Sequence, residues 1–344
     1  MQKKTNRPYK AYALLALLML VAVFYVIKPY LNKKAPVPAP TSKEAPKSGV
    51  PQIPVPDFSA DSAFLFLKKQ VDFGPRVPNS TAHKKCAEWF VKEFKRQGLT
   101  VVEQKFQAQH FKGTYFNGIN IIGQYKPELS KRILIAAHWD SRFQADKDTK
   151  DQNKPIDGAD DGGSGAAILL ELARTLAGNP VDVGVDLFLI DVEDQGEDGG
   201  PSETWCLGSQ YWAKNLHRPG YSPYYAILLD MVGAKDARFY KEGISREVAP
   251  QTVEMVWNLA ASLGYGEYFV NEDGGGITDD HLFIARDAKI PMIDIISTPN
   301  VGQHAFGSYH HTHNDNMSVI DKKVLKAVGQ TMTAVIYKLH NGTL

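Results

Sequence analysis

The stretch that decides the fold is Ile133-Leu-Ile-Ala-Ala137, followed at once by His138-Trp-Asp140. A short, continuous apolar run of this kind is typical of a strand buried on both faces of a sheet. Similar runs recur at 185–190, 225–229 and 292–296, and helix-like stretches separate them. This alternation of strands and helices predicts a parallel sheet that is covered by helices on both faces.

The flanking segments complete one large domain. The runs at 101–111 and 116–125 alternate or carry β-branched residues, and Lys112-Gly-Thr114 between them indicates a hairpin with an antiparallel edge. We therefore expect an α/β fold, a three-layer α/β/α sandwich around a mixed, mostly parallel sheet. The expected helices lie at 59–71, 80–97, 163–176, 207–216, 247–263 and 322–339.

Charge is distributed unevenly along the 344 residues, although the formal net charge is only +1. The first 50 residues contain nine Lys or Arg and one Glu, so the other 294 residues carry a net charge of −7. An acidic body argues against binding to nucleic acid, which requires a basic face. Cys86 and Cys206 are too few for a thiolate metal cluster, but they could form one disulfide bond.

Residues 11–28 are predicted to be a transmembrane anchor. Ala11–Ile27 is a run of 17 uncharged, mostly apolar residues, and a helix of that length spans roughly 25 Å. Only basic charges precede the run, so the positive-inside rule places residues 1–10 in the cytoplasm. The proline-rich residues 29–56 would form a tether, and 57–344 a catalytic metallo-domain facing the periplasm or the outside of the cytoplasmic (inner) membrane. A cleaved signal peptide is the alternative.

Imidazole or carboxylate groups follow the expected strands, at the sheet edge where open α/β folds bind ligands. Mixed ligands of these two kinds suit Zn²⁺ or a similar ion, whereas Ca²⁺ prefers oxygen ligands alone. The stretch Gly162-Gly-Ser-Gly165 lacks the spacing of a serine-hydrolase nucleophile elbow. The candidate groups are His138, Asp140, Asp161, Glu193, Asp194, Asp230, Asp280, His310 and His311.

Six motifs in order resemble the zinc-dependent exopeptidases, and most closely their glutaminyl-peptide cyclotransferase branch, the animal-like (type II) glutaminyl cyclases. The resemblance extends from about residue 60 to the C-terminus. A long segment containing Trp205 after Asp194, and the pattern beginning at Asp279, favour this branch over the aminopeptidases. The motifs are Ala136-Ala-His-Trp-Asp-Ser141, Gly158-Ala-Asp-Asp161, Asp191-Val-Glu-Asp194, Leu228-Leu-Asp-Met-Val-Gly-Ala234, Asp279-Asp-His-Leu282 and His310-His-Thr312.

The resemblance implies a metal site. Asp161, Asp194 and His311 match the family's metal ligands, and Asp194 stands where relatives commonly have Glu. His138 and Asp140 match a second-metal ligand of the aminopeptidases and the carboxylate that orients the ligands. One Zn²⁺ is expected, although the residues for a second site are also present.

The resemblance also implies catalytic and substrate-binding roles. Glu193 takes the position of the general base and acid, and Asp230 and Asp280 take those of the carboxylates that share its proton network. Trp205 is the candidate for contact with substrate. His310 stands next to the ligand histidine, where a cyclase usually has tryptophan, and is a second candidate.

The activity implied is zinc-dependent cyclisation of the N-terminal glutamine of peptides and proteins to pyroglutamate, with release of ammonia. The main alternative is a dinuclear zinc aminopeptidase. A catalytically silent binding domain on the same fold is a third reading, which the presence of all three principal ligands disfavours. The expected partners are N-termini that begin with Gln and, through the anchor, the cytoplasmic membrane.

Overall fold

The computed structural model describes residues 52–299 and 305–344, and these belong to one compact unit, Gly49–Leu344. The predicted anchor and almost all of the predicted tether lie outside the described residues. Among the helices of the described ranges, none is long and apolar enough to cross a membrane.

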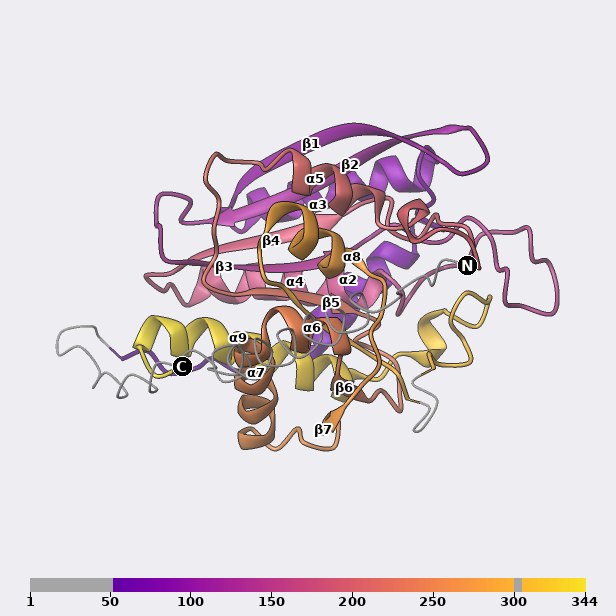
Figure 1. Cartoon of the computed structure of the whole chain (residues 1–344). Helices are drawn as coiled ribbons and strands as arrows, with labels where there is room; N and C mark the ends of the chain where they lie inside the picture. Colours follow the sequence, from indigo (N-terminus) through magenta and orange to yellow (C-terminus); the bar gives the residue numbers. More distant parts are fainter. Residues whose placement is uncertain (1–51, 300–304) are drawn as a thin grey trace, which may run out of the picture. The chain divides into compact units, whose positions relative to one another are not determined.

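A six-stranded mixed sheet forms the centre of this unit, with the strand order β1-β2-β4-β3-β5-β8 (Figure 1). Strands β3, β4, β5 and β8 run parallel, whereas the β1–β2 hairpin adds an antiparallel edge through the pairing of β2 with β4. The mixed, mostly parallel sheet expected from the sequence is therefore confirmed. The bounds are β1 (Thr100–Gln109), β2 (Tyr115–Tyr125), β3 (Arg132–His138), β4 (Gly184–Ile190), β5 (Ala226–Asp230) and β8 (Ile293–Ile296).

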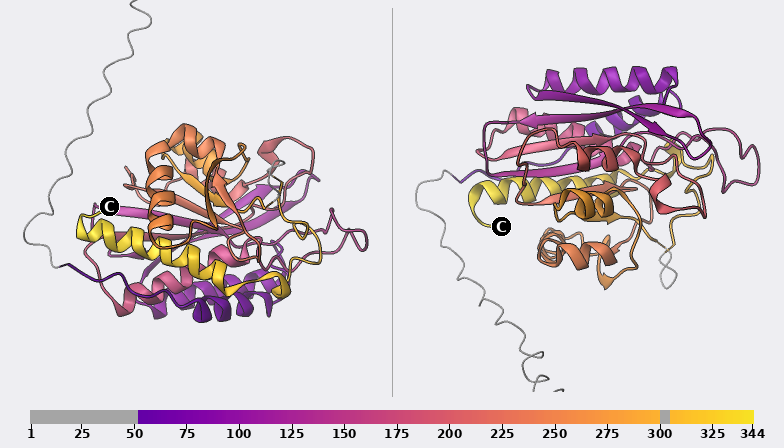
Figure 2. Two further views of the ribbon diagram at one scale, coloured as in Figure 1. Left: turned by 90° about the horizontal axis from the view of Figure 1, so that it is seen from below. Right: turned by 45° about the horizontal axis from the view of Figure 1, so that its top comes forward.

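Helices cover both faces of the sheet. Strand β3 is buried along its whole length, and its side chains alternate between two cores: Ile133 and Ile135 join one, and Leu134 and Ala136 join the other. The first core is closed by α2 (Ala60–Val71), α3 (Thr81–Arg96), α4 (Gly163–Gly178), α7 (Pro250–Ser262) and α9 (Lys322–Asn341), and the second by α5 (Leu207–Lys214) with the π-helix Ile284–Ala288. Figure 2 shows α9, in yellow, running beside the sheet.

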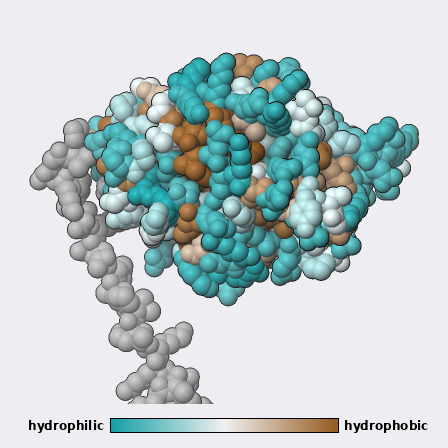
Figure 3. Space-filling view, turned by 90° about the horizontal axis from the view of Figure 1, so that it is seen from above, coloured by the Kyte–Doolittle hydropathy of each residue, from teal (hydrophilic) through white to brown (hydrophobic). Residues whose placement is uncertain are grey.

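One feature of the fold was not expected from the sequence. A second sheet pairs β6 (Phe239–Lys241) with β7 (Phe269–Asp273), and both strands are too short to give a clear sequence pattern. The remaining elements of the described ranges are α6 (Gly243–Val248), α8 (Asp280–Phe283) and the 3-10 helices Ser202–Thr204 and Met317–Val319. Cys86 and Cys206 are buried and free, so the disulfide bond that the sequence allowed is not formed. The face shown in Figure 3 is largely hydrophilic, with apolar side chains in small areas.

Candidate active site

Imidazole and carboxylate groups meet in one cavity at the carboxyl ends of the strands. Strand β3 ends at His138, β5 ends at Asp230, and the turn after β4 carries Glu193 and Asp194. The cavity has a volume of about 390 Å³. Seven residues singled out in the sequence line it: Asp161, Glu193, Asp194, Trp205, Asp230, His310 and His311. The structure thus brings together groups that are up to 150 residues apart in the chain.

The loop before α4 delivers Asp161 to this cavity. Gly165 lets the first turn of α4 lie directly against the sheet, because a Cβ atom there would be only 2.4 Å from the backbone oxygen of Leu229. Asp315 then fixes the loop, since its two oxygens accept hydrogen bonds from the backbone N–H groups of Asp160 and Asp161 at 2.8 and 3.2 Å. Backbone packing and a buried carboxylate therefore set the position of Asp161.

Asp161, Asp194 and His311, the expected metal ligands, line this cavity, and the ligand atoms of Asp161, His310 and His311 lie within 4.8 Å of one another. His311 Nε2 lies 3.0 Å from Asp194 Oδ1 and 3.7 Å from Asp161 Oδ2. Within residues 52–299 and 305–344, Asp161 Oδ2 and Asp194 Oδ2 are buried without a hydrogen-bond partner. Burial raises the pKa of Asp194 well above its usual range, and the charge of the neighbouring Asp161 raises it further. Two carboxylates and one imidazole are ligands that suit Zn²⁺.

Asp140 holds the turn that carries Glu193 and Asp194. Its Oδ1 accepts a hydrogen bond from the Glu193 backbone N–H at 3.1 Å, and its Oδ2 accepts one from that of Asp194 at 3.2 Å. The Gln195 side chain adds a bond to Oδ2 at 2.9 Å. Burial opposes ionisation of Asp140, yet the neighbouring His138 and these donors lower its pKa. Ionised Asp140 therefore holds the turn that carries Glu193 and Asp194.

His138 links two carboxylates below the cavity. Its Nε2 lies 3.0 Å from Asp161 Oδ1 and 3.1 Å from Asp230 Oδ1. Burial disfavours the charged imidazolium, but Asp140, Asp161 and Asp230 around it raise the pKa of His138 well above its usual range. The three ligand atoms also lie close enough together to hold a cation. The geometry therefore suits either a direct imidazole–carboxylate network or a second metal position.

Glu193 lies beside the ligand cluster without joining it. Its Oε2 is 3.9 Å from His138 Nδ1, and its Oε1 accepts a hydrogen bond from Cys206 Sγ at 3.2 Å. Burial raises the pKa of Glu193 well above its usual range, and the charges of Asp279 and Asp194 raise it further. A carboxyl group whose pKa is raised by burial can donate a proton as well as accept one.

The structure places Asp279, rather than the expected Asp280, at the cavity wall. Asp279 lines the cavity, and one of its oxygens lies within 4.8 Å of the nearest ligand atoms of Glu193 and Cys206. Asp280 is 0% exposed and does not line the cavity. The two residues are neighbours, but Asp279 is the extended N-cap of α8 and Asp280 is its first helical residue, so their side chains take different directions.

Trp205 and His310 lie next to His311, the expected metal ligand, at the cavity wall. The Trp205 ring is parallel to that of His311, with centroids 5.9 Å apart and an interplanar angle of 9°. The His310 ring stacks on His311 at 3.7 Å. Lys147 Nζ lies 3.3 Å from His310 Nδ1. Both residues singled out for substrate contact therefore lie at the wall of the cavity.

A model of peptidase family M28 matches residues 120–336, which is more than half of the chain. The chain belongs to peptidase family M28. It is similar to the crystal structure of Tannerella forsythia glutaminyl cyclase, with 48% sequence identity, a TM-score of 0.80, and coverage of 82% of this chain and 99% of that chain. A Zn-dependent exopeptidase from Parabacteroides distasonis matches with 49% identity and a TM-score of 0.80 over 83% of this chain and 99% of that chain. The glutaminyl-peptide cyclotransferase of Gloydius blomhoffii is 26% identical over 277 residues, or 71% of each chain. The resemblance to glutaminyl cyclases is thus confirmed.

Sequence reasoning missed two residues that contact the expected metal ligands Asp194 and His311. Arg142 is fully buried, and its Nη1 donates a hydrogen bond to the backbone oxygen of Asp194 at 3.0 Å. Its guanidinium also lies 4.6 Å from the Trp205 ring centroid. Arg142 pairs with Asp146, whose Oδ1 lies 3.6 Å from Nδ1 of His311. The position of Arg142 just after the His-Trp-Asp-Ser motif was the only signal in the sequence.

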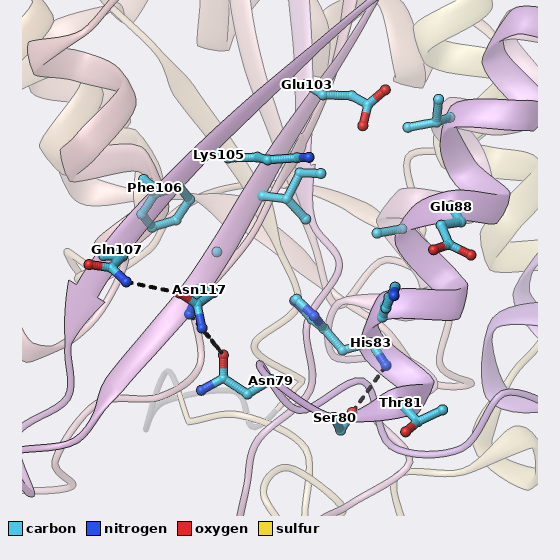
Figure 4. A pocket seen from close by; sticks show the side chains of 15 residues that line it. Asn79, Ser80, Thr81, His83, Glu88, Glu103, Lys105, Phe106, Gln107 and Asn117 are labelled. Atoms are coloured by element: carbon cyan, nitrogen blue, oxygen red, sulfur yellow. Dashed lines mark hydrogen bonds between the residues drawn. The ribbon is translucent and has the colours of Figure 1, made fainter.

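A larger cavity of about 1030 Å³ lies away from this site, between α3 and the β1–β2 hairpin (Figure 4). None of the predicted site residues lines it. His83 at its wall is bonded to Asp191, with Nε2 2.8 Å from Oδ2, and stacks on Trp139 at 4.5 Å. Asp191 Oδ1 in turn accepts a hydrogen bond from the Val192 backbone N–H. This contact between α3 and the end of β4 stabilises the turn that leads to Glu193.

Proposed function

We propose that this M28 protein cyclises the N-terminal glutamine of peptides and proteins to pyroglutamate and releases ammonia. The observation that carries the proposal is the position of Glu193, beside the ligand Asp194 and near Asp279, in a small cavity bordered by Trp205. Similarity to a glutaminyl cyclase over 82% of the chain supports the same activity.

Asp161, Asp194 and His311 would hold the zinc ion of the proposed enzyme. When bound there, Zn²⁺ supplies a Lewis acid for the γ-carbonyl group of the substrate. A single ion is proposed, because His138 Nε2 already contacts Asp161 Oδ1 and Asp230 Oδ1 at hydrogen-bonding distance. One imidazole nitrogen between two carboxylates can form a direct network at that position.

The cavity would hold the glutaminyl side chain folded back, so that the α-amine reaches its own γ-carbonyl carbon. Because the attack is intramolecular, holding this conformer supplies much of the catalysis. Trp205 and His310 would cover the substrate and exclude water, which prevents hydrolysis of the amide. The cavity volume of about 390 Å³ is in the range of sites for one small ligand, so the rest of the peptide would extend outside.

Glu193 would transfer the proton. It accepts a proton from the attacking α-amine as the new C–N bond forms, and it donates a proton to the departing amide nitrogen, which leaves as ammonia. Asp279 and Asp230 line the same cavity, and burial raises the pKa of both carboxyls. Carboxyl groups this close share protons, so this pair would share the proton that Glu193 takes from the amine until it passes to the leaving nitrogen.

The cluster of His138, Asp161 and Asp230 favours a second candidate, a zinc aminopeptidase, because the three could hold another ion. One assay separates the candidates. The full chain, loaded with zinc, is incubated with a peptide that begins with Gln, and the products are followed by mass spectrometry and an ammonia assay. Ammonia with an otherwise intact peptide supports the cyclase, whereas free glutamine supports the aminopeptidase.

The N-terminal segment is also assigned a role in this proposal. The apolar run at 11–28 and the basic residues before it support a membrane anchor, with 29–56 as a tether and the catalytic domain outside the cytoplasmic membrane. Fractionation of cells that express the full chain tests this. The enzyme should remain with the membranes after a high-salt wash, and deletion of 1–28 should release it.

A further inference from the structure

Cys206 contacts the proposed general base from the segment that follows Trp205. Its Sγ donates a hydrogen bond to Glu193 Oε1 at 3.2 Å. Two backbone hydrogen bonds fix this arrangement, from Cys206 N to the oxygen of Glu193 and from Leu207 N to that of Val192, both at 2.9 Å. Cys206 is 0% exposed. The thiol is therefore held against the carboxylate by the backbone of both partners.

The backbone at Cys206 does not explain the choice of cysteine. Its φ and ψ are 56° and 36°, in the left-handed region where glycine and asparagine are the preferred residues. Cysteine brings no conformational advantage there. Cys206 also lies at the start of α5, but its side chain makes no capping hydrogen bond to that helix. The thiol does make a hydrogen bond to Glu193. We therefore assign that contact as the reason for a cysteine at this position.

We propose that Cys206 is a positioning residue for Glu193. The thiol holds Oε1, which leaves Oε2 as the oxygen that exchanges protons with the substrate. Burial raises the pKa of the Cys206 thiol well above its usual range, and the charge of Glu193 raises it further, so the group keeps the proton that it donates. This inference rests on the proposed function, because it gives Cys206 its role through the base of that reaction.

The kinetic test compares three substitutions in the full chain. Cys206→Ala removes the donor, Cys206→Gly removes it while relieving the left-handed backbone, and Cys206→Ser keeps a donor. We expect the Ala and Gly variants to lower kcat by about 3–10-fold with KM changed by less than about twofold, the usual effect of one hydrogen bond made in the transition state. The Ser variant should recover most of kcat. Cys86→Ala, at a buried cysteine in α3, is the matched control and should keep kcat.

A purely structural role predicts a different pattern. Cys206→Gly would then unfold at the same or a higher temperature and keep kcat, because the backbone strain is gone. Unchanged kcat in the Ala and Gly variants, or a Ser variant no faster than Ala, would overturn the proposal. An inactive wild-type enzyme would instead refute the proposed function.

A spectroscopic measurement tests the contact without any turnover. The S–H infrared band of Cys206, identified by its loss in Cys206→Ser, should lie at lower frequency than that of Cys86. It should move when Glu193 is replaced by Gln. If the Cys206 band keeps its frequency in Glu193→Gln, the thiol does not bond to this side chain. That result would overturn the proposal, whichever reaction the enzyme catalyses.

Discussion

Replacing Asp140 with Asn should damage both the stability and the activity of the enzyme, although the two side chains have nearly the same shape. Asp140 accepts one hydrogen bond at Oδ1 and two at Oδ2, all from the turn that carries Glu193 and Asp194. An amide can accept through only one of its two atoms, so at least one backbone N–H of the turn would face another N–H group. Losing one charge-assisted hydrogen bond and burying one unpaired donor costs about 2–4 kcal/mol.

Two assays measure this cost. Urea unfolding of the zinc-loaded enzyme should give a free energy of unfolding lower by about 2–4 kcal/mol, and kcat/KM for a glutaminyl peptide should fall by roughly 10–100-fold, because the turn would relax. Asp61→Asn is the matched control. The Asp61 side chain is 80% exposed, and this variant should differ from wild type by less than about 0.5 kcal/mol. If Asp140→Asn keeps both wild-type stability and wild-type kcat/KM, Asp140 does not hold the turn that carries Glu193 and Asp194.

Three further substitutions test the other parts of the site. Glu193→Gln should keep its zinc, measured by atomic absorption, and lose about 10²–10⁴-fold in kcat; substantial remaining turnover would rule out Glu193 as the base. His311→Ala should lose zinc and activity together, and wild-type zinc affinity in a chelator titration would exclude His311 as a ligand. Trp205→Ala should raise KM by about 10-fold, because the substrate loses an aromatic wall; an unchanged KM would place the substrate elsewhere in the cavity.

Much of the fold could be predicted because the parallel strands are buried on both faces. Strand β3 sends alternate side chains into two cores, so both sets had to be apolar, and the run at 133–137 was recognisable. Strands β6 and β7 were not predictable, since they form a small separate sheet and are too short to show a clear alternation of apolar and polar residues.

The gathering of the site residues could also be predicted, because parallel strands end at the same edge of a sheet. The choice between Asp279 and Asp280 could not be made, since it depends on where α8 begins. Arg142 and Asp146 were missed for another reason. Their roles come from contacts with Asp194 and His311, which lie far away in the sequence.

The most direct test of the proposed activity uses a peptide whose N-terminal glutamine carries heavy nitrogen only in its side-chain amide. The zinc-loaded enzyme should release labelled ammonia and leave an unlabelled peptide that has no free α-amine and has gained no oxygen. Release of free, labelled glutamine, or labelled ammonia with a glutamate-terminated peptide, would contradict cyclisation and identify hydrolysis as the reaction instead.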